Sequence, residues 1–337
     1  MKATYSKHLL RFKTPSKTSR ETLVVKETWL ISIEENGKFG VGECAMFRGL
    51  SIDDRPDFEQ KLAWTCRNIA LGEAVLWQEL IAFPAIQIGV EMAFLALKNN
   101  VFEFFPSDFT EQKKPINING LIWMGDEVFM KKQIQDKISE GFSCLKLKIG
   151  GIAFEKELAL LDFIRTHFSA SEIEIRVDAN GAFGGKDVKA KLNQLAVFEL
   201  HSIEQPIAAN NHKLIADLCQ NTPLPIALDE ELIGVFGQDK EALLTKLKPQ
   251  FIVLKPSFVG GFRGTSEWIN LAAKHHIGWW ITSALESNIG LNAIAQYTFL
   301  QNNNLPQGLG TGGLFDNNFD TPLAVEHGKL WFKKQLK

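Results

Sequence analysis

The sequence predicts an α/β fold: a modified TIM barrel of the (β/α)7β type, with an α+β capping domain in front of it. One observation is that short apolar runs alternate with helical patterns from residue 115 onwards. The other is that charged residues end four successive runs. They are Asp178, Glu204, Asp229 and Lys255, at steps of 26 (178 to 204), 25 (204 to 229) and 26 (229 to 255) residues. One strand, one helix and their loops need about that length, so we expect the charges to meet at one rim of the barrel.

The first third of the chain has a different pattern. Residues 28–33 alternate apolar and polar positions, and Asn36-Gly37 is a strong hairpin signal, so residues 2–43 predict antiparallel strands. Helical spacing then takes over in residues 57–69 and 86–97. This part is therefore predicted to be α+β.

The change of pattern places the domain boundaries. We expect the capping domain at residues 1–110, completed by the C-terminal tail at about 316–337, and the barrel at residues 111–315. Two polar segments of the capping domain, residues 13–21 and 46–54, are predicted to be loops, the first of them mobile. Both are expected to close over the substrate.

The barrel requires eight strands with helices between them. The predicted strands are 115–119, 144–149, 172–178, 200–204, 225–229, 251–255, 278–283 and 305–309. The predicted helices are 125–140, 154–168, 186–198, 210–219, 238–247 and 263–275. Eight strands at this spacing favour a closed barrel over an open sheet.

Composition excludes several classes of partner. The formal net charge of -2 gives no reason to expect nucleic acid or an acidic membrane surface. The first residues lack the apolar segment of a signal peptide, and no apolar run is long enough to span a bilayer. The four cysteines are widely spaced, which is typical of a reduced protein. We expect a cytoplasmic protein, and the oligomeric state stays open.

Three carboxylates dominate the predicted rim. Asp178, Glu204 and Asp229 would end three successive strands, and like charges held this close repel unless a cation lies between them. Ligands that are all oxygen suit a hard ion such as Mg²⁺. The alternative is that each carboxylate is a helix cap or a surface acid, but three at even spacing favour a metal site.

Three lysines are predicted to face the same space. Lys146 and Lys148 lie two apart on one strand and share a face, and Lys255 ends a later strand. Inward lysines are costly unless they are paired, so they are either structural partners of the carboxylates or an acid/base pair. A lysine base at neutral pH needs its pKa lowered from about 10.4 towards about 7–8, which nearby positive charge can do.

Several motifs carry a resemblance to a known family. They are KLKIG (146–150), VDANGAF (177–183), IEQP (203–206), ALDE (227–230), LKPSFVGG (254–261) and SALESNIG (283–290). In these motifs the chain resembles the muconate-lactonizing subgroup of the enolase superfamily, and within it the o-succinylbenzoate synthases. A lysine base beside Mg²⁺ is the chemistry of that superfamily.

The resemblance implies a role for each residue. Lys148 would remove the proton α to the substrate carboxylate, Lys255 would stabilise the enediolate, and Lys146 would help to lower the pKa of Lys148. The implied ligands of Mg²⁺, for which Mn²⁺ is a possible substitute, are Asp178, Glu204 and Asp229. The implied substrate contacts are Asn180, Ser283, Glu286, Ser287, Arg20 and Arg48. A solvated loop charge is the alternative for both arginines.

The reaction that the resemblance implies is a dehydration. The family converts 2-succinyl-6-hydroxy-2,4-cyclohexadiene-1-carboxylate to o-succinylbenzoate in menaquinone biosynthesis, so the expected partner is a small-molecule carboxylate. An N-acylamino acid racemase or another cycloisomerase is the alternative, and a non-catalytic carboxylate-binding barrel is the alternative of another class. The stretch GLGTGG (308–313) lacks the Asp-x-Asp of dipeptide epimerases, which counts against that activity.

Overall fold

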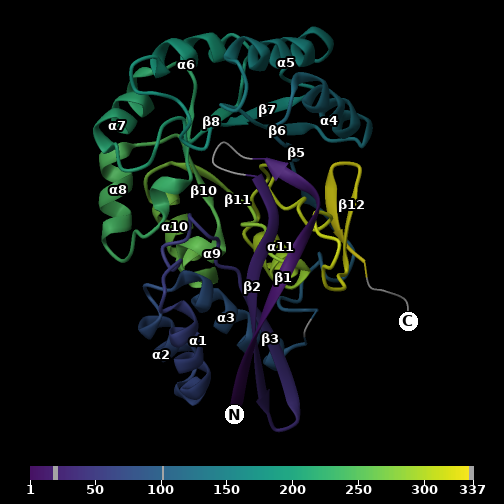
Figure 1. The fold of residues 1–337 in the computed structure, drawn as a ribbon, viewed down its shortest axis with the longest axis vertical. Coiled ribbons are helices and arrows are strands. Elements are labelled where there is room, and N and C mark those ends of the chain that lie inside the picture. Colours follow the sequence, from purple (N-terminus) through teal and green to yellow (C-terminus); the bar gives the residue numbers. More distant parts are fainter. Residues whose placement is uncertain (18–21, 101, 334–337) are drawn as a thin grey trace.

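The computed structural model describes residues 1–17, 22–100 and 102–333, and it contains two parts. Figure 1 shows a sheet wrapped by helices above a smaller part, which is made of strands and helices of its own. The paired strands of the smaller part run up from the N-terminus to the barrel. This is the α/β barrel with a separate antiparallel capping domain that the sequence predicts.

The capping domain is built on one antiparallel sheet. Its strands are β1 (Lys2–Lys17), β2 (Thr22–Glu35) and β3 (Lys38–Cys44), in that order. The predicted hairpin between β2 and β3 is confirmed. Asn36 (φ 51°) and Gly37 (φ 75°) both have the positive φ that a two-residue hairpin turn requires.

Three helices of the capping domain pack with this sheet or with one another. They are α1 (Phe58–Arg67), α2 (Glu73–Glu79) and α3 (Pro84–Lys98). The sheet and helices share a core of their own, to which Trp29, Ile31 and Ile86 contribute fully buried side chains. Burying each such side chain stabilises the fold by roughly 1.5–3 kcal/mol.

The predicted loop at residues 13–21 is wrong for its first five residues. Residues 13–17 belong to β1, and the pairing with β2 resumes after a register shift, with Ser16 opposite Leu23. Backbone pairing with a long partner strand therefore overrides the polar composition and Pro15. Residues 18–21 lie outside the described residues, whereas residues 46–54 contain neither helix nor strand, as predicted.

The barrel sheet has seven parallel strands, hydrogen-bonded in sequence order. They are β5 (Gly120–Ile122), β6 (Cys144–Lys148), β7 (Glu174–Asp178), β8 (Ser202–Glu204), β9 (Ile226–Leu228), β10 (Phe251–Leu254) and β11 (Gly278–Ile281). The helices are α4 (Glu127–Ser139), α5 (Phe154–His167), α6 (Val188–Ala196), α7 (His212–Asn221), α8 (Asp239–Leu247), α9 (Pro256–Val259), α10 (Gly261–Lys274) and α11 (Asn288–Leu300). Most of them surround the sheet in Figure 1 and pack on apolar side chains such as Leu145 and Leu147.

Closure of the barrel differs from the prediction. The segment 305–309 forms no strand, but two isolated parallel bridges, Ile118 with Gln307 and Thr282 with Gly308, join it to both edges of the sheet. This segment therefore takes the place of the eighth strand. The chain is held there by single bridges because glycine and proline interrupt a regular ladder.

The predicted first barrel strand, residues 115–119, is confirmed only at its end, where Ile118 forms the parallel bridge to Gln307. β4 (Ile116–Asn117) pairs antiparallel with β13 (Lys329–Phe332), which pairs with β12 (Leu323–Glu326). The barrel sheet starts at β5 instead, because the C-terminal hairpin supplies a partner from the far end of the sequence. The domain boundaries stay a prediction.

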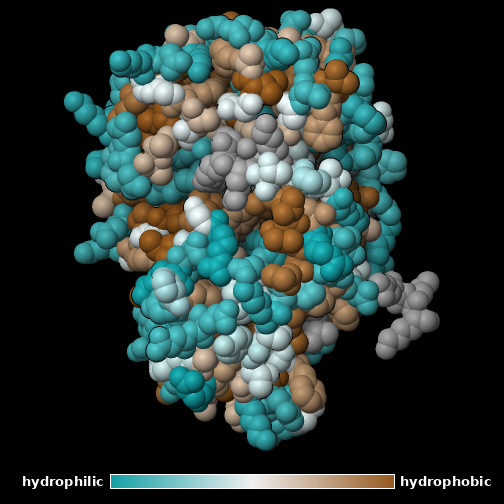
Figure 2. Space-filling view, viewed as in Figure 1, coloured by the Kyte–Doolittle hydropathy of each residue, from teal (hydrophilic) through white to brown (hydrophobic). Residues whose placement is uncertain are grey.

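The surface is mixed. Figure 2 shows a largely hydrophilic face with hydrophobic residues in smaller patches around its middle. Within the described part of the chain, no helix combines the length and apolar character needed to cross a bilayer.

Candidate active site

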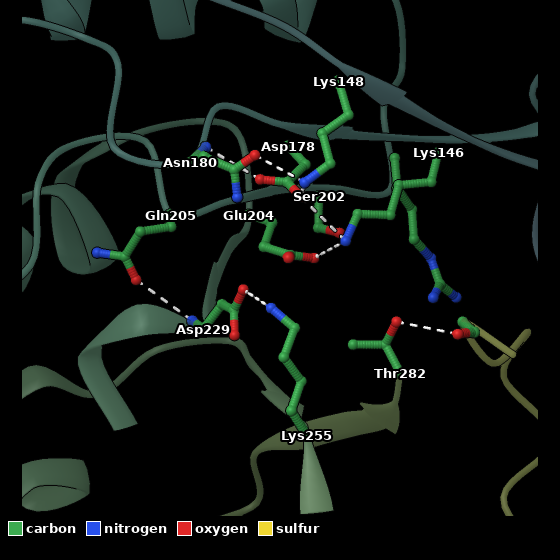
Figure 3. A network of polar contacts seen from close by, with 12 residues as sticks. Lys146, Lys148, Asp178, Asn180, Ser202, Glu204, Gln205, Asp229, Lys255 and Thr282 are labelled. Atoms are coloured by element: carbon green, nitrogen blue, oxygen red, sulfur yellow. Dashed lines mark hydrogen bonds and ion pairs between the residues drawn. The ribbon is translucent and has the colours of Figure 1, made fainter. Parts of the chain in front are cut away.

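The predicted charged residues meet at the carboxyl ends of the barrel strands. Lys148, Asp178 and Glu204 are the last residues of β6, β7 and β8, and they lie side by side in the register of the sheet. Asp229 and Lys255 follow β9 and β10 directly. Parallel strands bring their carboxyl ends to one rim, so residues far apart in sequence form a single cluster (Figure 3).

Ion pairs connect the cluster across the barrel. Lys146 Nζ lies 2.6 Å from Glu204 Oε2 and 3.1 Å from Asp178 Oδ2, and Lys148 Nζ lies 2.9 Å from the same Asp178 oxygen. Lys255 Nζ forms an ion pair with Asp229 Oδ2. All three lysines therefore point into the barrel, as the sequence predicts (Figure 3).

Two polar residues fix the geometry of the carboxylates. Asn180 Oδ1 accepts a hydrogen bond from Lys148 Nζ (2.7 Å), and the Asn180 backbone N–H donates to Asp178 Oδ1 (3.0 Å). Gln205 Oε1 accepts from the Asp229 N–H (3.2 Å). Asn180 (φ 45°) and Gln205 (φ 37°) both have left-handed backbone, which non-glycine residues adopt mainly where surrounding structure imposes it.

The carboxylates differ in their proton affinity. Burial raises the pKa of Asp178, but the charges of Lys146 and Lys148 outweigh it and hold that pKa below its usual range. Burial raises the pKa of Glu204 to about 8, and the negative charges of Asp178 and Asp229 contribute to the shift.

The carboxylates next to Lys146 and Lys255 raise the pKa values of these two lysines. This direction is opposite to the lowered lysine pKa that the sequence leads us to expect. Burial lowers the pKa of Lys146, but Asp178 and Glu204 outweigh it and raise that pKa above the usual range. Burial also lowers the pKa of Lys255, and Asp229 outweighs it in the same way. The reason is that each lysine lies against a carboxylate rather than against another cation.

The donor set suits a hard cation. Glu204 Oε1 is buried and has no hydrogen-bond partner among the described residues. The possible metal ligands around it are carboxylate oxygens. As they stand, no three His, Cys, Asp or Glu side chains of the described chain are gathered closely enough to hold a metal ion. The lysines occupy the carboxylate oxygens instead, so the ligand set Asp178, Glu204 and Asp229 stays a prediction.

A cavity of about 100 Å³ opens above the cluster. The barrel contributes Lys146, Lys148 and Lys255 to its walls. The capping domain contributes apolar side chains, and these are Leu23, Phe47 and Leu50. The charged groups of the cavity therefore come from the barrel, whereas the capping domain supplies apolar groups, which suits a ligand with a carboxylate and a hydrocarbon part.

The structure separates the predicted substrate contacts into two groups. Asn180 and Ser283 line the cavity, and Ser283 Oγ lies 2.6 Å from Thr311 Oγ1. Glu286 and Ser287 are fully buried and are not among the lining residues. Ser257 Oγ donates to Glu286 (2.5 Å), and Ser287 bonds to the capping domain, so the geometry does not support substrate contact for either.

Of the two predicted arginines, Arg48 is not part of the cluster. Arg48 is exposed and forms ion pairs with Glu27 (2.6 Å) and Asp54 (2.7 Å) on the capping domain. Arg20 lies outside the described residues. The alternative of a solvated loop charge therefore fits Arg48 better.

Sequence reasoning missed several residues of the cavity wall. Trp123, Phe258 and Thr311 line it, and so does Asn119, whose Oδ1 is buried without a hydrogen-bond partner in the described chain. Apolar wall residues carry no motif that distinguishes them from the core. Asn119 and Thr311 could have been found from their places beside the first and eighth barrel segments.

Known proteins resemble this chain over nearly its whole length. Residues 130–335 match the family described as Enolase C-terminal domain-like. The chain is 44% identical over 362 aligned residues to the o-succinylbenzoate synthase of Desulfotalea psychrophila, with 98% of each chain covered. The crystal structure of MenC from the same organism superimposes with a TM-score of 0.87 at 42% identity, covering 98% of this chain and 99% of that one.

More distant structures share the fold alone. The dipeptide epimerase of Enterococcus faecalis, complexed with Mg and the dipeptide L-Leu-L-Tyr, superimposes with a TM-score of 0.84. It is 18% identical, with 98% of this chain and 96% of that chain covered.

Proposed function

The chain belongs to the o-succinylbenzoate synthases of the enolase superfamily, and from that premise we propose how its cavity performs the family's dehydration. The chain is a lyase of this family. The proposed substrate is 2-succinyl-6-hydroxy-2,4-cyclohexadiene-1-carboxylate, and the product is o-succinylbenzoate for menaquinone biosynthesis. One observation carries the mechanism: Lys148 and Lys255 line the same cavity from β6 and β10, with the strand-end carboxylates between them.

Lys148 is the proposed base. Its Nζ reaches the cavity from the end of β6 and is held by Asp178 and Asn180, so its position is fixed before substrate binds. The neutral amine takes the proton α to the carboxylate, and the electrons of the C–H bond form the enediolate. The ammonium then returns that proton to the departing hydroxyl, the C–O bond breaks, and water leaves as the ring becomes aromatic.

Lys255 and Lys146 supply positive charge. Lys255 lies on the other side of the cluster from Lys148 and faces the developing negative charge of the enediolate. Lys146 is buried between Asp178 and Glu204 and balances their charge. Neither residue needs to give up a proton for the dehydration.

A divalent ion completes this proposal. Mg²⁺, or Mn²⁺ in its place, held by Asp178, Glu204 and Asp229 would supply the charge that binds the substrate carboxylate. The oxygen-only donors and the unpartnered Glu204 Oε1 support it. The Mg in the epimerase of similar fold supports it at the level of the superfamily.

The capping domain is proposed to exclude water. Leu23, Phe47 and Leu50 form the apolar side of the cavity, where they would face the ring of the substrate. Excluding water strengthens the attraction between the lysines and the developing charge.

An N-acylamino acid racemase is the second candidate. The observation that favours it is again the pair of lysines on one cavity, because racemisation needs an acid/base group on each face. Exchange of solvent deuterium into both enantiomers of an acylated amino acid, lost in a Lys255→Ala variant, would establish that activity.

An absorbance assay tests the main proposal. We expect fast loss of the diene absorbance with Mg²⁺ and none with a chelator. No turnover while Mg²⁺ still binds would overturn the proposed dehydration and leave the racemase.

The state of the four cysteines supports the proposed cytoplasmic location. All four are free thiols, as expected in a reducing compartment.

A further inference from the structure

A buried carboxylate of the capping domain is bonded to a helix of the barrel. Glu43, next to the end of β3, is fully buried. Its Oε2 accepts hydrogen bonds from Ser287 Oγ (2.5 Å) and from the Gly290 N–H (2.9 Å), and its Oε1 accepts from the Ser287 N–H (2.9 Å). These donors are the N-cap residue and first turn of α11, where a negative charge is favoured by the helix dipole.

A second carboxylate forms the same kind of contact with the neighbouring helix. Glu91, in the middle of α3, is buried. Its Oε2 accepts from the Phe262 N–H (2.5 Å) and its Oε1 from the Arg263 N–H (3.1 Å), in the first turn of α10. Gly261 makes room for it, since a Cβ there would lie 2.1 Å from Glu91 Oε2.

The two carboxylates are rigidly connected inside the capping domain. β3 and α3 lie so close that a Cβ on Gly42 would lie 1.9 Å from the Gly89 carbonyl oxygen. A Cβ on Gly40 would lie 2.1 Å from the Ala93 carbonyl oxygen. Backbone contact of this kind leaves little freedom for β3 and α3 to slide, so Glu43 and Glu91 act as one body.

Glu43 joins the two walls of the cavity. Four residues after it, Phe47 lines the cavity from the capping domain. On the barrel side, Ser283 and Leu285 line the same cavity shortly before the N-cap residue Ser287. The hydrogen bonds of Glu43 therefore lie within a few residues of both walls.

Glu91 lies similarly close to the third wall. Lys255 and Phe258 line the cavity, and the chain runs from them through Gly260 into α10. The first turn of α10, which Glu91 holds, is seven residues from Lys255. A shift of α10 would move the short segment that carries the lysine.

We propose that Glu43 and Glu91 are positioning residues, which lock the capping domain to α11 and α10 and thereby fix the distance between the apolar wall and the lysines. The proposal rests on the proposed function, because the cavity must be the active site. The two residues touch neither the lysines nor the strand-end carboxylates in any described contact. They act through the helices that they hold.

Steady-state kinetics of Glu43→Ala and Glu91→Ala test the proposal. We expect kcat to fall about 10- to 100-fold in each variant, because a misplacement of about 1 Å can cost that much. Glu43→Gln keeps one acceptor oxygen and should recover part of the loss. KM should change less than kcat, since the residues that bind the substrate remain.

Thr28→Val is the matched control. Thr28 Oγ1 donates to Glu43 Oε1 (2.7 Å) from inside the capping domain, so this variant removes a buried hydrogen bond of Glu43 but none that reaches the barrel. A merely structural role predicts that Thr28→Val and Glu43→Gln lose kcat alike. The positioning role predicts a kcat within about threefold of wild type for Thr28→Val alone.

Hydrogen exchange measures the effect of the Glu43 contact on the backbone without an assay of catalysis. Residues 46–54 and 283–290 should exchange faster in Glu43→Gln than in wild type, even if Glu43→Ala fails to fold. Unchanged exchange, or alanine variants within threefold of the wild-type kcat, would overturn the proposal. If wild type shows no synthase turnover but Glu43→Gln still exchanges faster than wild type, the proposed function is overturned and the positioning contact is kept.

Discussion

Two sets of buried carboxylates in this molecule have different partners. At the rim, Asp178, Glu204 and Asp229 contact lysine ammonium groups. At the interface with the capping domain, Glu43 and Glu91 contact backbone N–H groups and hydroxyls of two helices. Lysine partners balance the charge of a buried carboxylate, whereas partners in the first turns of two helices connect the carboxylate to those helices.

The proton affinities do not follow this division, because burial also raises the pKa of Glu204 at the rim to about 8. Lysine charges hold the pKa of Asp178 below its usual range despite burial. Burial raises the pKa of Glu91 to about 8, because the two N–H groups that oppose the shift carry only partial charge.

Among the residues of the rim, the loss of Lys148 should lower the catalytic rate most. Lys148→Ala should lower kcat by at least about 10²-fold, as expected for a lost general base. Circular dichroism should show an unchanged fold. Lys132→Ala, which removes an exposed lysine paired with Asp136, is the control and should keep the wild-type rate. A Lys148→Ala variant with more than a tenth of the wild-type rate would mean that another group is the base.

Lys146 should matter for stability before metal binds. Lys146→Met leaves the buried Asp178 and Glu204 without their shared cation, so the free energy of unfolding in chelator should fall by about 3–5 kcal/mol. Urea denaturation with and without Mg²⁺ measures it. Mg²⁺ should recover more stability in the variant than in wild type. Equal recovery would show that no ion binds between these carboxylates.

Asp229 tests the proposed ligand set. Asp229→Asn should weaken Mg²⁺ binding by at least about tenfold in calorimetric titration, since loss of even an outer-shell partner costs 10–100-fold. Asp217→Asn, which changes an exposed partner of Lys189, should leave the affinity unchanged. Unaltered affinity in Asp229→Asn would remove that residue from the ligands.

The interface set should show the smallest effect, and it depends on pH. The folded-state pKa of Glu91 is raised from 4.5 to about 8, so the folded protein holds a proton that the unfolded chain releases. Between about pH 4.5 and 8 this residue makes stability fall as pH rises. The free energy of unfolding of Glu91→Gln, measured by urea denaturation, should therefore be closer to that of wild type at pH 8 than at pH 5. An identical difference at both pH values would contradict the shift.

The sequence predicts the barrel well because βα units are local. β6, β7 and β8 are short strands that end at the charged residues of the rim, so the sequence alone places Lys148, Asp178 and Glu204 correctly. The alternation along β6 also predicts correctly that Lys146 and Lys148 face inwards.

Predictions that depend on distant partners are less successful. The sequence assigns β4 to the barrel sheet, but β4 pairs with the C-terminal hairpin, and residues 13–17 extend β1 instead of forming a loop. Glu286 and Ser287 stand next to the rim in sequence, but Glu286 is bonded to Ser257 and Ser287 to Glu43 of the capping domain. None of these outcomes leaves a local pattern in the chain.

The sequence by itself determined the fold class, the inward lysines and the order of charges around the rim, because strand periodicity and βα spacing act over a few tens of residues. Only the tertiary structure decided which groups those charges pair with, and that Phe47 and Leu50 face them. It also decided that Glu43 and Glu91 hold helices of the other part of the molecule. Such contacts join residues more than 170 positions apart, so they arise when the two parts dock and no local preference can encode them.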